Sequence, residues 1–567
     1  SYGTITGWYN NTARAGTASN PFWEFRADPN VSTTEDYNFG YYNSAARLWD
    51  QIAYNAPYYL MVKSAGNNRN QTGPAIGQPY WRLSSSGTWV LEAQRQAGIS
   101  SNNGYDIIAT YGTAKNILTV GAVEPIANGY KTPADVKISS FSSWGPTDDG
   151  RIKPDIVGNG VGLMSSVGTA DDAYSSMNGT SMAAPNVSGS LNLLQEHYHN
   201  IFGEFMRAAT LKGLAIHTAD EAGTTPGPDY VYGWGLLNME KAARMISNPG
   251  SNLINERTLA QGETYTFNVT ASGAGPLMVT ISWTDLEGQV IPVGPSALNN
   301  RTPRLVNDLD VRVSKGLTTY LPWVLDPANP TLAASFGDNF RDNVEQVFIA
   351  NAVPGENYTV TIRHKGTLAN GPQAYTLLVS GIGGSAYCAS NALSDADSKI
   401  THFSLGALNN TPAAGCSASG DYTNLTANLE IGQTVPMSLT LGTCGADNSK
   451  VGKVYIDWNN DGDFEDQGEL VATTGVFSGT ETYNTTVTVP TYVKEGNISR
   501  MRVVLAETMN PGDVSACGTY GKGETHDYRV KFLAASRDVG ISAVMFPSKG
   551  FCANPAQNLE LEIRNLG

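Results

Sequence analysis

Charged residues, and basic residues above all, are scarce in this sequence. Asp, Glu, Lys and Arg make up only 15% of the 567 residues, and 51 acidic residues outnumber 36 basic ones, which gives a net charge of −15. This excess of negative charge argues against nucleic acid or an anionic membrane as the main partner. The hydrophobic content of 41% is typical of a well-packed globular protein rather than a disordered one.

Long hydrophobic runs are absent as well. No apolar segment approaches the length of a membrane span, and the start of the chain does not have the pattern of a signal peptide. We therefore expect no membrane insertion in this segment. The chain opens at Ser1 without an initiator Met and stops at Gly567 in a strand-like pattern, so we interpret both ends as cut.

Cysteine is missing from the first two thirds of the chain. The five cysteines are Cys388, Cys416, Cys444, Cys517 and Cys552. Cysteines confined to later, loop-rich modules favour disulfides and an oxidising, extracellular setting. Four of them would form two bridges with three possible connectivities, and we expect Cys552 to pair beyond the cut. The sequence thus predicts a secreted, extracellular or cell-surface protein.

The chain is too long for one hydrophobic core, and its length predicts three or four domains. Residues 1–250 alternate helix-like and strand-like patterns, which is typical of an α/β fold with a mainly parallel sheet flanked by helices. The period changes to two in residues 251–382, which predicts a β-sandwich or jelly roll. Residues 383–535 form a further β-rich module, and residues 536–567 begin another that is truncated.

A serine at the start of a predicted helix is the first candidate for chemistry. Apolar residues recur after it at helical spacing, so one face of residues 182–199 should be buried. Ser181 would then stand at a helix N-terminus, where free N–H groups and a partial positive charge favour a developing anion. The alternative is an ordinary capping turn, because Ser and Thr are favoured there for their hydrogen bonds.

An asparagine after a predicted buried strand is the second candidate. The apolar run 59–62 is consistent with a parallel strand, and it leads into Ala65-Gly66-Asn67. Ligands of an open α/β sheet bind at the carboxyl ends of its strands, and an amide side chain there can donate to an oxyanion. The alternative is an Asn-rich turn, since Asn68 and Asn70 follow.

Both candidates resemble segments of the subtilisin-like serine proteases. Gly179-Thr180-Ser181-Met182-Ala183-Ala184-Pro185 is similar to the nucleophile motif of that family, and Ala65-Gly66-Asn67 is similar to its oxyanion-hole segment. The resemblance implies a secreted endopeptidase that acts on proteins and needs no organic cofactor. In it, Ser181 would form the acyl-enzyme, and Asn67 would bind the oxyanion.

The resemblance also implies where a substrate would bind. Ser1-Tyr2-Gly3 is similar to the Ser-x-Gly strand edge that pairs with substrate backbone in this family. Ser1, Tyr2 and Gly3 would line one side of the S1 pocket, and Ser64, Ala65 and Gly66 the other. These residues are small or neutral, which predicts an uncharged P1 side chain.

The catalytic Asp and His of the family are missing from this sequence. Neither an Asp-Ser/Thr-Gly nor a His-Gly-Thr motif occurs, and none of the six histidines lies in such a motif. One explanation is that the N-terminal part of the catalytic domain belongs to the same protein but lies outside this chain, so that activity requires it. The other explanation is that the protein has a catalytically inactive subtilase fold and serves in extracellular binding or adhesion. The presence of both Ser181 and Asn67 favours the first.

Two acidic segments predict structural calcium. Residues 457–469 offer alternating oxygen ligands and a glycine turn, which a hard cation requires; the predicted ligands are Asp457, Asn459, Asp461, Asp463 and Glu469. An acidic surface hairpin is the alternative. Further candidate ligands lie in the predicted sandwich, where solvated carboxylates at strand ends are the alternative: Asp308, Asp310, Asp338 and Asp342.

The later modules resemble known families too. Residues 305–310 and 338–345 are similar to the β-domain that follows the catalytic domain in large bacterial subtilases. The string 523–528, Gly-Glu-Thr-His-Asp-Tyr, resembles the signature of GEVED modules in secreted bacterial proteins, largely of the Bacteroidota. The segment from Asp538 resembles CARDB-type domains. The resemblance implies a multidomain, secreted protein of such a bacterium.

Overall fold

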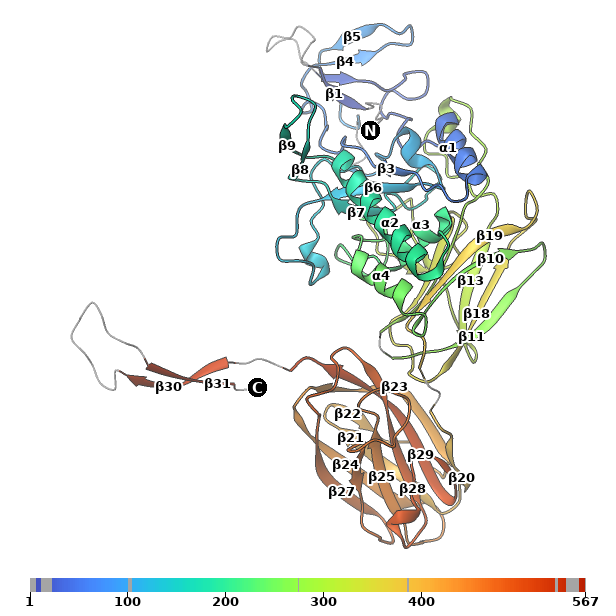
Figure 1. Ribbon diagram of the computed structural model, residues 1–567, viewed down its shortest axis with the longest axis vertical. Coiled ribbons are helices and arrows are strands. Elements are labelled where there is room, and N and C mark those ends of the chain that lie inside the picture. Colours follow the sequence, from blue (N-terminus) through green and yellow to red (C-terminus); the bar gives the residue numbers. More distant parts are fainter. Residues whose placement is uncertain are drawn as a thin grey trace. The chain divides into compact units, whose positions relative to one another are not determined.

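The computed structural model describes residues 7–11, 23–99, 104–273, 275–384, 387–535, 539–546 and 560–565 (Figure 1). They form two compact units. Unit 1 comprises Ser1–Val269, Leu277–Ile349 and Tyr358–Ile382, and unit 2 comprises Thr270–Pro276, Ala350–Asn357 and Gly383–Gly567. The expected fold class is confirmed, because unit 1 contains a parallel sheet with helices and unit 2 consists of β-sheets. The predicted boundaries at residues 250, 382 and 535 stay predictions.

A three-stranded parallel sheet lies at the centre of the α/β part of unit 1. Its order is β3 (Val62–Ser64), β6 (Leu118–Val123) and β7 (Ile156–Asn159). All six residues of β6 are buried, as the continuous apolar run requires of a central parallel strand. Among the described residues β3 pairs only with β6, so β3 is an edge of this sheet.

Four helices pack around the sheet (Figure 1). Helix α2 (Thr180–Phe202) buries Ala183, Val187 and Leu191 against β6 side chains, and α3 (Ala208–His217) and α4 (Met239–Ser247) join the same core. Helix α1 (Ser44–Asn55) belongs to a separate core cluster that contains Ile117 and Met61. Because Met61 and Val62 belong to different clusters, the segment entering β3 turns successive side chains to opposite faces.

The second part of unit 1 is a β-sandwich. One sheet has the order β10-β19-β12-β17 and the other β11-β18-β13-β14. Alternate residues of β18, namely Tyr358, Val360 and Ile362, are buried as the period-two pattern predicts, whereas β12, β17 and β19 are buried along most of their length. The strands are β10 (Asn252–Leu259), β11 (Tyr265–Thr270), β12 (Leu277–Trp283), β13 (Leu309–Lys315), β14 (Thr318–Tyr320), β17 (Val344–Ile349), β18 (Asn357–His364) and β19 (Gln373–Ser380).

Short strands and 3-10 helices complete unit 1. The strands are β1 (Trp8–Asn10), β2 (Trp23–Phe25), β4 (Tyr80–Leu83) and β5 (Trp89–Glu92) in one sheet, and the pairs β8 (Leu163–Ser166) with β9 (Tyr174–Met177) and β15 (Trp323–Val324) with β16 (Ser335–Phe336). The 3-10 helices are η2 (Thr110–Thr113), η3 (Pro133–Asp135) and η4 (Pro295–Ala297).

A buried ion pair joins the two parts of unit 1. The Lys115 Nζ donates to Asp285 Oδ2 at 2.5 Å and to the carbonyl oxygens of Leu286 and Arg304 at 2.5 and 2.8 Å. Both charged side chains have no solvent exposure. Helix α3 adds to this junction by packing against β12 and β19. The parallel sheet and the sandwich therefore share one interior.

Replacing Lys115 by Met is expected to lower the free energy of unfolding of unit 1 by about 3–5 kcal/mol, because Asp285 would keep a buried charge without its partner. Urea denaturation of the full chain measures this change. The exposed Lys131 provides the control, since Lys131→Met removes the same charge at the surface and should change stability by less than about 0.5 kcal/mol. Equal effects of the two variants would contradict the structural role of Lys115.

Unit 2 contains two facing β-sheets. One has the order β20-β29-β28-β25-β26, with β23 also paired to β29, and the other has the order β22-β21-β24-β27. Side chains of both sheets meet in one core cluster that includes Phe403, Leu439 and Val503. The strands are β20 (Ser390–Ser394), β21 (Ser398–Leu405), β22 (Leu408–Asn410), β23 (Ser419–Glu430), β24 (Thr434–Thr443), β25 (Val451–Ile456), β26 (Leu470–Thr473), β27 (Glu481–Thr488), β28 (Ile498–Ala506) and β29 (Gly518–Leu533).

Two disulfides cross-link unit 2. They join Cys388 to Cys517 and Cys416 to Cys444, which selects one of the three connectivities that the sequence left open. Cys552, expected to pair elsewhere, lies outside the described residues. The unit also contains the 3-10 helix η5 (Pro511–Asp513) and the hairpin β30 (Val539–Phe546) with β31 (Glu560–Asn565).

Candidate active site

The N-terminus of α2 presents Ser181 at the end of the parallel sheet. Gly179 caps the helix with φ +152°, and its N–H donates to the Gly160 carbonyl oxygen at 2.8 Å. A methyl group on Gly160 would lie 2.5 Å from Ala122 Cβ and 2.8 Å from the Gly179 carbonyl oxygen, so only glycine allows this approach. The helix start is thereby fixed to the loop after β7, and Ser181, its second residue, is partly exposed.

Asn67 is attached to the same helix start. Its Oδ1 accepts hydrogen bonds from the Thr180 N–H at 2.9 Å and from the Thr180 hydroxyl at 2.8 Å. The Gly66 N–H donates to the Thr180 hydroxyl oxygen at 3.2 Å, and Gly66 takes φ +121°, which favours glycine. Because Oδ1 is held by two donors, the Nδ2 of Asn67 is left to face the other way.

The side-chain nitrogen of Asn67 and the backbone nitrogen of Ser181 lie close together beside Gly179. A methyl group placed on Gly179 would lie 3.3 Å from Asn67 Nδ2 and 3.6 Å from the Ser181 backbone nitrogen. A helix N-terminus adds its own partial positive charge at this place. Preorganised N–H groups aimed at one point next to a serine hydroxyl can stabilise the oxyanion that forms when the serine attacks a carbonyl. The structure therefore brings together the two residues that the sequence singled out.

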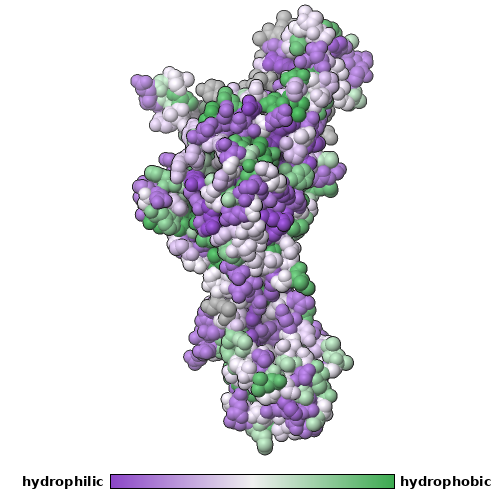
Figure 2. All heavy atoms as spheres, turned by 90° about the vertical axis from the view of Figure 1, so that its right-hand side faces the viewer, coloured by the Kyte–Doolittle hydropathy of each residue, from purple (hydrophilic) through white to green (hydrophobic). Residues whose placement is uncertain are grey.

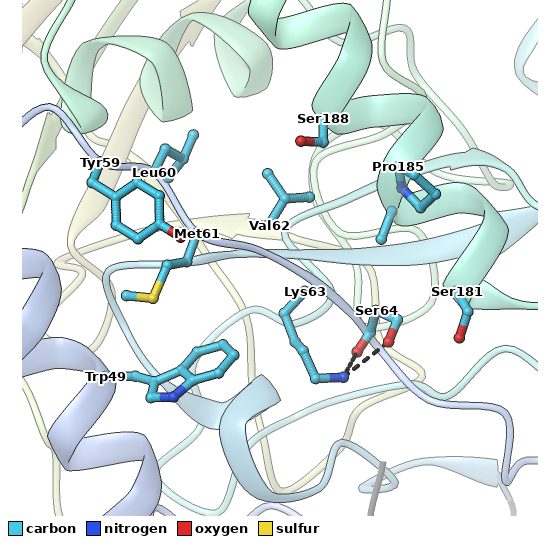
Figure 3. Close-up of a pocket in the computed structure, with 11 residues that line it drawn as sticks. Trp49, Tyr59, Leu60, Met61, Val62, Lys63, Ser64, Ser181, Pro185 and Ser188 are labelled. Atoms are coloured by element: carbon cyan, nitrogen blue, oxygen red, sulfur yellow. Dashed lines mark hydrogen bonds between the residues drawn. The ribbon is translucent and has the colours of Figure 1, made fainter. Parts of the chain in front are cut away.

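A cavity of about 630 Å³ opens beside Ser181 (Figure 3). Figure 3 shows Ser181, Pro185 and Ser188 on α2 on one side and the segment entering and forming β3 on the other. Of the residues expected to bind substrate, Ser64 lines the cavity, Ala65 is buried beside it, and Ser1, Tyr2 and Gly3 lie outside the described residues. The lining residues are Trp49, Tyr59, Leu60, Met61, Val62, Lys63, Ser64, Ser181, Ala184, Pro185 and Ser188.

Lys63 is a residue of this cavity that the sequence reasoning missed. Its Nζ donates to the Ser64 carbonyl oxygen at 2.8 Å and to the Ser64 hydroxyl at 2.9 Å (Figure 3). Burial lowers the pKa of Lys63 to about 8, because the charged amine is disfavoured away from water. The sequence signal that could have identified Lys63 is its position directly after the apolar run 59–62.

None of the six histidines lines the cavity next to Ser181. His217, at the end of α3, is buried between the hydroxyls of Thr280 and Ser380 at 2.8 and 2.9 Å. Burial lowers the pKa of His217 to about 3, so its imidazole is neutral. The other five contact their own neighbours, for example His197 with Ser247 and His526 with Glu524. The described residues thus hold the serine and the N–H donors but no histidine base.

The acidic residues of the sandwich meet lysine and arginine instead of forming a metal site. Lys365 Nζ lies 3.1 Å from Asp308, 3.0 Å from Asp310 and 2.8 Å from Asp338, and Arg312 contacts Asp310 and Asp338 as well. Asp342 lies apart and accepts from the Ile152 N–H. Calcium at these four residues stays a prediction, although the ammonium of Lys365 already supplies a positive charge to Asp308, Asp310 and Asp338.

The loop 457–469 of unit 2 satisfies its carboxylates internally. Asp457 accepts from the N–H groups of Asn460 and Gly462 and from the Tyr387 hydroxyl, and Glu469 accepts from the Trp458 N–H. Burial, with Asp457 and Asp461 nearby, raises the pKa of Glu469 to about 7. Within the described ranges no group of three or more His, Cys, Asp or Glu side chains is placed to hold a metal ion. Calcium at this loop stays a prediction.

Comparison with known families gives the class of the first unit. Residues 27–235 match the model of the subtilase family, and residues 451–531 match that of the GEVED domain. The chain therefore contains a subtilase domain, which is a domain of the subtilisin-like serine protease family, followed by a GEVED domain.

Individual relatives share short regions with this chain. The C5a peptidase of Streptococcus pyogenes serotype M18 is 51% identical over 67 residues, which are 12% of this chain and 6% of that protein. Pyrolysin of Pyrococcus furiosus is 39% identical over 109 residues, 16% of this chain and 8% of that protein. The chain thus spans a small part of the length of these relatives. The solved self-cleaved protease domain of PatA is 19% identical, with a TM-score of 0.25 over 37% of this chain and 58% of that chain.

Proposed function

We propose that the subtilase domain acts as a secreted serine endopeptidase that hydrolyses peptide bonds in proteins through an acyl-enzyme on Ser181. The observation that carries this proposal is that Asn67 Nδ2 and the Ser181 backbone nitrogen lie 3.3 and 3.6 Å from one point beside Gly179. If Asn67 only capped the helix, its Oδ1 acceptor would be sufficient. Such a cap would not require Asn67 Nδ2 to lie near Ser181. Peptide-bond hydrolysis uses both donors and the hydroxyl together.

The reaction follows from these positions. The Ser181 Oγ attacks the scissile carbonyl carbon while a base takes the hydroxyl proton, and the oxygen that becomes negative is held by Asn67 Nδ2 and the Ser181 N–H. Breaking the C–N bond releases the amine, which receives that proton, and leaves an ester on Ser181. Water then attacks the ester carbonyl carbon while the base takes its proton. The proton is passed to Ser181 Oγ as the ester bond breaks, which releases the acid. The small, neutral Ser64, Ala65 and Gly66 beside the serine favour an uncharged P1 side chain.

We infer that the base, a histidine, and the aspartate that orients it come from a further segment of the same protein. This is supported by the absence of any histidine around the cavity and by the edge position of β3. The backbone of Val62–Ser64 pairs on one side only, and the cavity lies along this strand and α2. A strand and helix from such a segment would pair with β3 and fill this space beside Ser181.

A fluorophosphonate probe tests the proposal on the complete protein. Only an activated serine reacts with such a probe, so covalent labelling at Ser181, located by peptide mass spectrometry, is the expected result. Labelling in the complete protein but not in residues 1–567 alone would support a base from another segment. No labelling in either would refute the proposal and favour the second function, an inactive subtilase-fold protein for extracellular binding.

Secretion is the localisation that we propose. The two disulfides of unit 2 favour an oxidising compartment. No helix in the described part of the chain is long and apolar enough to cross a membrane. On the face shown in Figure 2, hydrophilic and hydrophobic residues are interspersed.

Calcium at the loop 457–469 is a further part of the proposal. We expect a chelator to lower the thermal midpoint of the full chain, because calcium would bind the oxygens of this loop only in the folded state. Scanning calorimetry with and without the chelator measures the shift. Asp461→Asn should reduce it, since Asp461 is exposed and its replacement disturbs little else. An identical shift in the wild type and in this variant would refute calcium at the loop.

A further inference from the structure

Lys63 is the only charged residue among those that line the cavity beside Ser181 in the described part of the chain (Figure 3). Its exposed fraction is 8%, and the other residues of the lining are apolar, aromatic or hydroxyl-bearing. An ammonium group buried in such surroundings is costly unless a carboxylate lies beside it. The cavity therefore contains a positive charge whose burial the proposed reaction does not explain.

No carboxylate of unit 1 compensates this charge. The Lys63 Nζ donates to the carbonyl oxygen and the hydroxyl of Ser64, and both acceptors are neutral. In the part of the chain that the structure describes, burial lowers the pKa of Lys63 to about 8 and no neighbouring carboxylate raises it again. The remaining residues of unit 1, which are 1–6, 12–22 and 100–103, include no Asp or Glu. Unit 1 therefore offers Lys63 no acidic partner.

The amine of Lys63 lies at the unpaired edge of β3. The Ala65 N–H donates to the Val120 carbonyl oxygen at 2.9 Å and so points toward β6. A trans peptide unit points its N–H and its carbonyl oxygen in opposite directions, so the Ser64 carbonyl oxygen, which shares this unit, points away from β6. This oxygen is the acceptor that the N–H of a further strand would use. In the present chain it accepts from Lys63 instead.

We propose that Lys63 forms an ion pair with an Asp or Glu of the further segment that brings the histidine base, and that this pair holds the segment against β3. The proposal rests on the proposed function, which supplies that segment. A backbone N–H of the incoming strand would take over the Ser64 carbonyl oxygen, and the amine of Lys63 would then turn to the carboxylate. The attraction between opposite charges in an apolar cavity offsets the cost of burying both.

The lining of the cavity indicates what else the segment must present. Around the amine the cavity is apolar, and these side chains favour an apolar occupant with a single carboxylate: Trp49, Leu60, Met61, Val62 and Pro185. A strand or helix with several charges would bury some of them without a partner. The partner is therefore an apolar segment in which one acidic side chain faces Lys63.

Lys63→Met tests the ion pair. In the complete protein this change leaves the carboxylate buried without its partner, so we expect the thermal midpoint of the subtilase domain to fall by about 6–20 °C. In residues 1–567 alone it removes a buried, unpaired charge, so the midpoint should stay the same or rise. Lys131→Met, at an exposed lysine, should shift neither midpoint by more than about 2 °C. Equal shifts of Lys63→Met in the two chains would overturn the proposal, because Lys63 would then act through Ser64 alone.

Zero-length cross-linking of the complete wild-type protein identifies the acid and needs no variant that must fold. A carbodiimide converts a carboxylate into an O-acylisourea; the amine of Lys63 attacks its carbonyl carbon, loses a proton and expels a urea, which leaves an amide. We expect peptide mass spectrometry to find Lys63 joined to an Asp or Glu outside residues 1–567. The control is Lys241, whose Nζ lies 2.7 Å from Asp220. If Lys241 is joined to Asp220 and Lys63 is joined to no acid, the proposal is wrong.

Fluorophosphonate labelling separates this proposal from the proposed function. Labelling of Ser181 in a protein whose Lys63 is joined to no acid would keep the endopeptidase and refute the ion pair. A cross-link from Lys63 without labelling would keep the ion pair, in a protein that is inactive. If Lys63→Met raises KM and leaves the thermal midpoint of the complete protein unchanged, the carboxylate belongs to the substrate, and the proposal is refuted.

Discussion

Ser181→Ala is expected to lower peptide hydrolysis by the complete protein by about 10⁶-fold, to the level left by binding and the oxyanion donors alone. Ser181 is the second residue of α2, and its backbone nitrogen lies beside Asn67 Nδ2 at the start of this helix. Its removal deletes the atom that forms the acyl-enzyme, and an alanine at the second position of a helix leaves the fold intact. Initial rates with a peptide substrate and fluorophosphonate labelling are the measurements.

Ser188 provides the control for this variant. It lies on the same helix and lines the same cavity, as Figure 3 shows, but it is seven residues, about two turns, further along α2. Ser188→Ala should therefore retain hydrolysis within about twofold of the wild type, because its replacement is an exposed surface change. Unchanged hydrolysis in Ser181→Ala, with the loss in Ser188→Ala instead, would refute the assignment of the nucleophile.

Asn67→Ala is expected to lower kcat by about 10²–10³, with little change in KM, because one of two oxyanion donors is lost. Asn67→Asp is a sharper variant. Its carboxylate can still accept from the Thr180 N–H and hydroxyl, so the loop stays attached to α2, but it has no N–H to offer and repels the developing negative charge. We expect Asn67→Asp to lose at least as much kcat as Asn67→Ala. Steady-state kinetics with one peptide substrate measure both.

The neighbouring Asn68 is the control for Asn67. Its side chain bonds to Gln71 within the loop and does not contact the helix start, so Asn68→Ala should leave kcat nearly unchanged. If Asn67→Ala raises KM and leaves kcat within about tenfold of the wild type, Asn67 holds the loop and does not act on the oxyanion. The same conclusion follows if Asn67→Asp keeps the activity of the wild type.

The parts of the site that the sequence predicted are those with local causes. A glycine, two hydroxyl residues and an apolar stripe in one continuous segment are sufficient to predict a helix with a serine at its start, and Ser181 is the second residue of α2. The position of β3 was less well predicted. The apolar run 59–62 suggested the strand, but its pairing with β6 joins Val62 to Leu118 and Ser64 to Val120. Where a strand begins depends on the strand with which it pairs, and the apolar run alone does not contain that information.

Residue pairs far apart in the sequence were decided by the tertiary structure. The sequence shows Asn67 and Thr180 as members of two motifs, but only the fold brings them within hydrogen-bond distance across 113 residues. The same holds for the carboxylates of the sandwich. Asp308 and Asp310 suggested a calcium site, and only the fold shows that Lys365, just after β18, lies within 3.1 Å of both carboxylates. A pattern within a segment shows which ligands a site offers, and the fold decides which partner reaches them.

The sequence by itself indicated the subtilase and GEVED domains and the order of α/β and β-rich parts, because these depend on composition, periodicity and short motifs. The tertiary structure decided which cysteines pair and that Asn67 meets Thr180 at the start of α2. Such meetings arise from strand pairing and loop packing between distant segments. Their energies depend on burial and on distances between atoms, which the linear order of residues does not specify.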